Sequence, residues 1–99
     1  MKNQITTQRI VLRRLLRTFI EDHVMSSLRQ FIADITLAHV EISDRNGRRG
    51  GGDKRCRIRI VPKIGDAIVV EDTEANPKRA IRQAALLAQV AIKRQLRLA

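Results

Sequence analysis

Apolar positions recur every three or four residues in two long stretches of the chain, which predicts two amphipathic helices. The first stretch runs from about Ile10 to Phe31, with Leu12, Leu15, Leu16, Phe19, Ile20, Val24 and Leu28 between them. The second follows Asn76-Pro77 and extends to about Leu96; Asn is a favoured helix N-cap and Pro a favoured first helical residue. Its predicted inner stripe consists of Ala80, Ile81, Ala84, Leu87, Ala88, Ala91 and Ile92.

Between these helices the period changes to two, which is typical of strands with one buried face. In residues 37–43 the side chains predicted to face the core are Ala38, Val40 and Ile42. In residues 55–60 they are Cys56, Ile58 and Ile60, and Pro62 ends the strand because it has no N–H to donate.

Turn signals separate the strands and complete the predicted fold. Asn46-Gly47 lies in a glycine-rich loop, and Gly65-Asp66 leads into a third strand over 67–71 with Ile68 and Val70 inward. Residues 3–7 are predicted to form a short edge strand. The expected fold is α+β in the order β-α-β-β-β-α, a four-stranded, antiparallel-rich sheet with two helices packed on one face. The 99 residues fit one domain, 1–99.

The charge of the chain indicates a polyanionic partner. Twenty Lys and Arg against ten Asp and Glu give a net charge of +10 and a pI near 11.4. Nucleic acid is the leading partner, and a membrane surface or an acidic protein is the alternative. Trp and Tyr are absent and both Phe residues lie on the first helical stripe. Backbone and shape recognition of folded RNA is therefore favoured over base stacking.

Basic residues gather in four places that we predict to bind RNA: one turn of the first helix, the glycine-rich loop, the strand after it and the start of the last helix. The glycine-rich loop allows close approach of the backbone to phosphates, and arginines at alternate positions of a strand lie about 7 Å apart, near the phosphate spacing of RNA. Cations at the start of the last helix oppose its dipole, at about 0.3–1 kcal/mol each, which suggests that they are used. A merely solvated charged surface is the alternative. The predicted RNA-binding residues are Arg13, Arg14, Arg17, Arg45, Arg48, Arg49, Lys54, Arg55, Arg57, Arg59, Lys78, Arg79 and Arg82.

Catalytic and metal-binding patterns are missing from the sequence, so we expect no enzyme, no cofactor and no metal. The two histidines and one cysteine form no zinc-ligand pattern, and the glycine-rich loop lacks the Gly-Lys-Ser/Thr ending of a phosphate-binding loop. Asp44 and Asp53 flank that loop, where a turn cap and a charge partner are favoured over catalysis. His39 is expected on the surface and His23 partly buried. Cys56 is expected in the core.

The N-terminal stretch and the single cysteine together predict a cytoplasmic protein. Arginines break the N-terminal stretch, so neither a signal peptide nor a transmembrane helix is expected. A single cysteine permits no disulfide within the chain, which fits a reducing cytoplasm.

The run DRNGRRGGGDKRCRIRI, residues 44–60, resembles the signature of ribosome hibernation-promoting factors and ribosome-associated inhibitors. This family is also known as sigma-54 modulation or ribosomal subunit interface proteins, and the chain is similar to its short form. The matching positions are Asp44, Asn46, Gly47, Gly50 or Gly51, Asp53, Lys54, Arg55 and Cys56, with weaker similarity at Phe31, Ile35 and Val40 and at Ala80, Ile81 and Ala84. The first strand has fewer alternating apolar residues than the family pattern, and the second domain of long members is not expected here.

The resemblance implies a fold like a double-stranded RNA-binding domain and a site in the decoding channel of the small ribosomal subunit. There the protein would contact ribosomal RNA, exclude tRNA and mRNA, and inhibit translation in stress or stationary phase. The expected partners are the small subunit and its rRNA, with no small-molecule substrate and no membrane, and the protein is expected to be a monomer or weak dimer. A general RNA-binding, polyanion-binding or protein-interaction module that does not act on the ribosome is the alternative.

Overall fold

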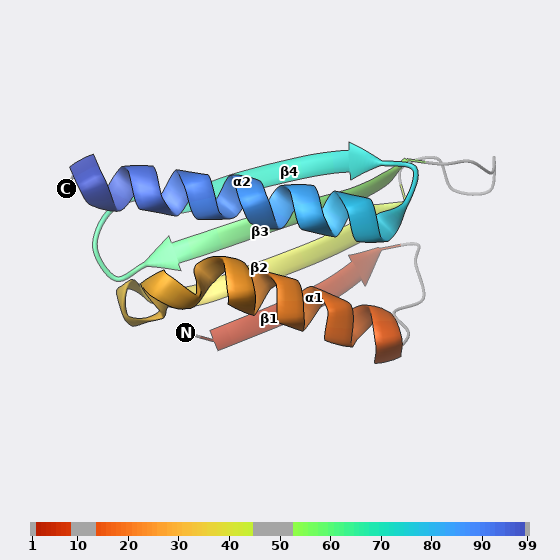
Figure 1. Cartoon of the computed structure of the whole chain (residues 1–99), viewed down its shortest axis with the longest axis horizontal. Coiled ribbons are helices and arrows are strands. Elements are labelled where there is room, and N and C mark those ends of the chain that lie inside the picture. The colour runs from red at the N-terminus through yellow and green to blue at the C-terminus, as the bar shows by residue number, and fades with distance from the viewer. Residues whose placement is uncertain (1, 9–13, 45–52, 99) are drawn as a thin grey trace.

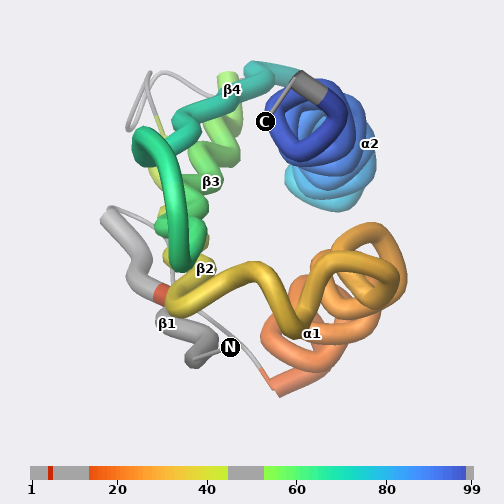
Figure 2. The backbone as a smooth tube through the Cα atoms, turned by 90° about the vertical axis from the view of Figure 1, so that its left-hand side faces the viewer, coloured from red at the N-terminus to blue at the C-terminus, as the bar shows by residue number. Residues whose placement is uncertain are grey.

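Two helices cover one face of a sheet in the computed structural model, which describes residues 2–8, 14–44 and 53–98 (Figure 1). The elements are β1 (Lys2–Gln8), α1 (Arg14–Leu28), a 3-10 helix η1 (Arg29–Asp34), β2 (Ile35–Asp44), β3 (Lys54–Pro62), β4 (Ile68–Glu74) and α2 (Pro77–Leu98). Figure 2 looks along the molecule and shows both helices on the same side of the strands. The predicted α+β class, with an antiparallel sheet and two helices, is therefore confirmed.

The antiparallel part of the sheet has three strands, β2, β3 and β4. β2 pairs with β3 and β3 with β4, and the strand order is β1-β2-β3-β4. β1 lies at the edge and runs parallel to β2, with Ile5 opposite Val40. Parallel neighbours need a crossover connection, which the segment containing α1 provides. The sequence predicted a four-stranded, antiparallel-rich sheet. In the structure, three strands are antiparallel and β1 joins them in parallel at one edge.

The core lies between the helices and the inner face of the sheet. The predicted inward residues of β2 and β3 are all buried, and Ile58 and Ile60 have no exposed surface. Small residues of α2, among them Ala84 and Ala88, are also buried without exposed surface. Their short side chains bring α2 close to the sheet, so the aliphatic residues of the strands and of α1 fill the space between the layers.

Two leucines predicted to face the core are exposed instead. Leu15 is 84% exposed and Leu87 is 44% exposed, while Ala85, which the predicted stripe omits, is buried. The prediction was wrong there because α2 packs through its alanines, which turns the bulkier Leu87 toward solvent. In α1 the buried residues begin only at Ile20, five residues after Leu15.

The ends of the elements follow their local chemistry. Asn76 caps α2, since the backbone N–H of Lys78 donates to Asn76 Oδ1 at 2.8 Å, and Pro77 is the first helical residue. Pro62 ends β3, as predicted. The first helix is shorter than predicted: α1 ends at Leu28 and the chain continues as η1. The predicted residues 10–13 lie outside the described residues.

Gly65 turns the chain between β3 and β4 with a φ of +102°, a region that L side chains rarely adopt. A Cβ at this position would lie 3.0 Å from Gln95 Nε2, which donates to the carbonyl oxygen of Asp66 at 3.0 Å. We expect Gly65→Ala to lower the free energy of unfolding by about 1–2 kcal/mol, measured by urea denaturation. If the backbone conformation is the cause, Gly65→Ala lowers the free energy of unfolding equally in a Gln95→Ala background. If the effect disappears in that background, the cause is the clash with the Gln95 side chain.

Candidate nucleic-acid interface

The outer face of the sheet, opposite the helices, presents the arginines of β3. Arg55, Arg57 and Arg59 alternate with the buried residues Cys56, Ile58 and Ile60, as the sequence predicted. The strand register places Arg57 between Glu41 of β2 and Glu71 of β4. Whether these arginines are available to a ligand therefore depends on which of them the two glutamates contact.

Both glutamates pair with Arg55 rather than with Arg57. Arg55 Nη2 lies 3.4 Å from Glu41 Oε1, and Arg55 Nη1 lies 3.9 Å from Glu71 Oε2. The Arg55 side chain is only 19% exposed. Arg55 is thus neutralised by the protein's own carboxylates, and three equivalent arginines in register are not what the structure presents.

Arg57 and Arg59 remain exposed, and neither makes an ion pair with a carboxylate of the described residues. Together with His39 and Glu41 they line a hollow of about 150 Å³ on the open sheet face. Guanidinium groups held side by side on a strand suit contacts with successive phosphates. His39 is half-buried in this hollow rather than fully on the surface.

We expect Arg55→Ala and Arg57→Ala to separate a structural arginine from a ligand-binding one. Arg55→Ala leaves Glu41 and Glu71 without their cation and is expected to lower the free energy of unfolding by about 1–3 kcal/mol. Arg57→Ala is expected to leave stability nearly unchanged and to reduce the slope of log affinity for RNA against log salt by about 0.7–0.9. Urea denaturation and RNA titrations at graded salt measure both; equal salt slopes for the two variants would contradict this assignment.

A second group of cations lies where the start of α2 meets α1. Lys78 Nζ and Arg82 Cζ each lie 5.5 Å from the centre of the Phe19 ring, and the His23 ring lies 4.2 Å from the same ring. Cation–π contacts of this kind contribute about 0.5–1 kcal/mol at exposed sites. The ring holds both cations at the junction of the helices, and Lys78 and Arg82 make no ion pair within the described residues. We call Lys78, Arg82 and Phe19 the helix-junction cluster.

Several other predicted cations are paired with acids of the chain. Lys54 Nζ lies 2.9 Å from Asp44 Oδ2, Arg79 Nε 3.1 Å from Glu74 Oε1, and Arg17 Nε 3.4 Å from Glu21 Oε1. The Arg79 and Arg17 side chains are exposed, so solvent screens these pairs and either arginine can turn to a ligand. Arg14 is exposed at the start of α1. Arg13, Arg45, Arg48 and Arg49 lie outside the described residues.

The structure thus brings the predicted site residues to two faces of the molecule, the outer sheet face and the helix side. Sequence reasoning missed the parts that decide which cations are available. Phe19 was assigned only to the helical stripe, although His23 follows it at the four-residue spacing that places side chains together on a helix. Glu41 and Glu71 lie on the same face of the sheet as the arginines. The alternation of apolar and polar residues along the strands already indicated this.

Cys56 lies beside Asp72 on the inner face of the sheet, because the two residues are direct cross-strand partners. Burial, and secondly the charge of Asp72, raises the pKa of the Cys56 thiol from 9.0 to about 12. Burial, with a hydrogen bond to Glu74 and its charge, also raises the pKa of Asp72. The thiol is therefore protonated and inert at neutral pH, as expected for a core residue.

We expect iodoacetamide to alkylate native Cys56 at pH 8 at least about a thousandfold more slowly than the urea-unfolded chain. The same shift makes stability depend on pH. The unfolded thiol loses its proton above pH 9 while the folded one keeps it toward pH 12, so the free energy of unfolding falls as the pH rises through that range. Rapid alkylation of the folded protein would contradict the buried, protonated thiol.

Other kinds of site find no support in the described ranges. Residues 2–8, 14–44 and 53–98 contain no group of three or more His, Cys, Asp and Glu side chains that could hold a metal ion. Neither helix, over the part that the structure describes, is long and apolar enough to cross a membrane.

Comparison with known proteins gives one family and a set of similar folds. The family model described as sigma 54 modulation protein / S30EA ribosomal protein matches residues 3–97. No curated protein matches the chain. The N-terminal domain of Protein Y from Thermus thermophilus is similar with a TM-score of 0.76 and 20% identity, over 95% of this chain and 98% of that one. A ribosomal subunit interface protein from Coxiella burnetii has a TM-score of 0.82 and 13% identity, over 96% and 97%. At these identities the structural similarity establishes the fold.

Proposed function

Because the chain belongs to the sigma 54 modulation protein / S30EA ribosomal protein family, we propose that it binds ribosomal RNA in the decoding channel of the small subunit and inhibits translation during stress or stationary phase. Proteins of this family are non-catalytic ribosome-associated factors, in agreement with the expectation that the chain is no enzyme. One of the similar structures is described as a ribosomal subunit interface protein, which supports a ribosomal partner.

The observation that carries the proposal is the set of exposed cations left without a carboxylate partner among the described residues. Arg57 and Arg59 on the sheet and Lys78 and Arg82 at the helix junction have this property. The chain's own acids neutralise Arg55 and Lys54 instead, so the charges of these two residues are not available to a ligand. A phosphate chain gains most from cations that are held in place and have no competing acid beside them.

The mode of recognition follows from the side chains that are present. Trp and Tyr are absent and both Phe residues pack against the core. The protein would therefore read the backbone and shape of folded RNA, in the manner of a double-stranded RNA-binding domain. We propose a single RNA-binding domain over residues 1–99 that acts in the cytoplasm, as a monomer or weak dimer, without cofactor or small-molecule substrate.

Sedimentation of a lysate through a sucrose gradient tests the proposal. We expect the tagged chain to sediment with small subunits or whole ribosomes from starved cells, and to move to the top of the gradient when the salt is raised. Protein that stays at the top at low salt, from both growing and starved cells, would refute the ribosomal role. It would favour the alternative, a general RNA or polyanion-binding module.

Inhibition needs its own measurement, because a bound protein can be harmless. Purified protein added to cell-free translation is expected to reduce synthesis and to compete with tRNA for the small subunit. The charge-reversed variant Arg57→Glu/Arg59→Glu serves as the control, with urea denaturation to show that it is folded. Equal inhibition by this variant would exclude a contribution of the sheet face.

A further inference from the structure

A mostly apolar hollow of about 590 Å³ lies between the β3–β4 turn and the last turns of α2. Ile64, Ile68, Ala91 and Leu96 form its apolar lining, and Ile64 is 86% exposed. An apolar hollow with an exposed aliphatic side chain at its rim is a candidate binding surface for another molecule. None of these four residues belongs to the proposed RNA-binding set.

The walls of the hollow are fixed by the fold. Gln95 Nε2 donates to the carbonyl oxygen of Asp66 at 3.0 Å and ties the turn to α2. Gly65 adopts its positive φ at the same turn, and Pro62 is buried at the end of β3 just before it. The hollow is therefore formed before a partner arrives, which lowers the entropic cost of binding.

Cations outnumber acids around the hollow. Arg94 and Asp66 both line it, and Arg94 also borders a neighbouring depression formed with Val90, Lys93 and Arg97. Residues 77–99 contain six basic and no acidic side chains. Lys93, Arg94 and Arg97 make no ion pair in the part of the chain that the structure describes. An RNA backbone would meet these cations but leave the apolar lining in water, whereas an acidic peptide with a bulky apolar residue satisfies both.

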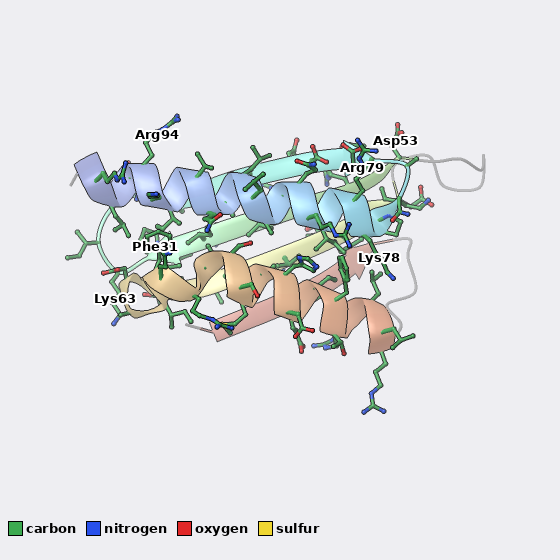
Figure 3. All side chains as sticks on the ribbon, viewed as in Figure 1. Phe31, Asp53, Lys63, Lys78, Arg79 and Arg94 are labelled. Atoms are coloured by element: carbon green, nitrogen blue, oxygen red, sulfur yellow. The ribbon has the colours of Figure 1, made fainter. Side chains whose placement is uncertain are left out.

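We propose that this hollow, between the β3–β4 turn and the C-terminal half of α2, docks an acidic protein segment that inserts an apolar side chain. It lies at the opposite end of the molecule from the helix-junction cluster: Figure 3 shows Arg94 and Lys63 at one end and Lys78 and Arg79 at the other. The longest dimension of the molecule is 44 Å. A protein partner can thus bind at one end while RNA occupies the other, a function beyond the proposed one.

A designed peptide tests the site on the full chain, independently of ribosomes. The probe is a fluorescein-labelled peptide in which a Leu-Phe pair is flanked by aspartates, and its control replaces Leu-Phe by Ser-Ser at the same charge. We expect the control peptide to bind at least about tenfold more weakly, because it loses the buried apolar side chains. Backbone amide shifts in NMR are expected at Gly65, Ala91 and Leu96. Equal affinity of the two peptides, or no binding of the Leu-Phe peptide, would overturn the proposal.

Two substitutions in the protein separate docking from general attraction to a basic chain. Arg94→Glu is expected to weaken binding of the Leu-Phe peptide at least about tenfold. Arg82→Glu makes the same charge change at the other end of α2 and is expected to weaken it by less than about threefold. Equal losses would mean that net charge alone attracts the peptide, and would overturn the proposal.

Filling the hollow tests its apolar part. Ala91→Met adds side-chain volume in the hollow without altering charge. It is expected to weaken binding of the Leu-Phe peptide but not binding of the Ser-Ser peptide. Unchanged binding of the Leu-Phe peptide would place its apolar residues elsewhere on the protein. Urea denaturation verifies that each variant folds.

Discussion

Lys78→Glu/Arg82→Glu is expected to weaken binding to purified small ribosomal subunits at least about a hundredfold at low salt. The Phe19 ring holds both cations at the junction of α1 and α2, and no acid of the described residues competes for them. Reversal removes two phosphate contacts and adds two repulsive charges at the same place. The neutral variant Lys78→Ala/Arg82→Ala is expected to reduce the salt slope of log affinity by about 1.4–1.8.

The matched control is Lys93→Glu/Arg97→Glu, which makes an identical charge change at the far end of the same helix. Because those residues lie outside the proposed RNA-binding set, we expect a loss of less than about tenfold from the lower net charge. Filter binding at graded salt measures all variants. Equal losses in the two double variants would show that total charge, and not the helix-junction cluster, governs binding. Phe19→Leu is expected to cause an intermediate loss of affinity, since it keeps an apolar residue but removes the ring that both cations contact.

Ile58→Ala is expected to lower the free energy of unfolding by about 2–5 kcal/mol, more than a substitution on the protein surface. Ile58 has no exposed surface and pairs with Val40 on one side and Val70 on the other, at the centre of the sheet under the helices. The close-packed residues around it can collapse only partly into the space of the lost side chain. Domains of this size have about 5–15 kcal/mol of total stability, so the melting temperature should fall by more than about 10 °C.

Val69→Ala is the control for this core substitution. Val69 lies on the neighbouring strand with its side chain on the outer face, and it is 47% exposed. Its truncation is expected to change the free energy of unfolding by less than about 0.5–1 kcal/mol, measured by urea denaturation with thermal melting as a check. A loss of similar size in both variants would contradict the assignment of the core to the inner face.

Features that depend on neighbours along the chain were readable from the sequence. The cap at Asn76 and the end of β3 at Pro62 need only the local backbone, and both are found where predicted. The alternation that buries Cys56, Ile58 and Ile60 was also correct. A strand has a side-chain period of two whatever covers it, so the pattern of apolar residues is sufficient to assign its faces.

The buried faces of the helices were harder to predict, because the width of a buried helical face depends on the element that packs against it. The apolar stripe of α2 included Leu87, yet the helix packs through alanines and leaves Leu87 exposed. Spacing alone does not distinguish a leucine that fills the core from one at the edge of the stripe. The depth of the contact between α2 and the sheet decides it, and that depth is a property of the packed layers.

The residue pattern is enough to assign a basic α+β domain with two amphipathic helices and arginines on one face of a central strand. Which of those cations are free to act depends on how the strands and helices pack. Register between strands assigns Glu41 and Glu71 to Arg55 and leaves Arg57 and Arg59 unpaired among the described residues, and packing of α1 on α2 puts Lys78 and Arg82 over Phe19. Net charge can be counted along a chain, but the neutralisation of each charge depends on distances between segments that are far apart in sequence.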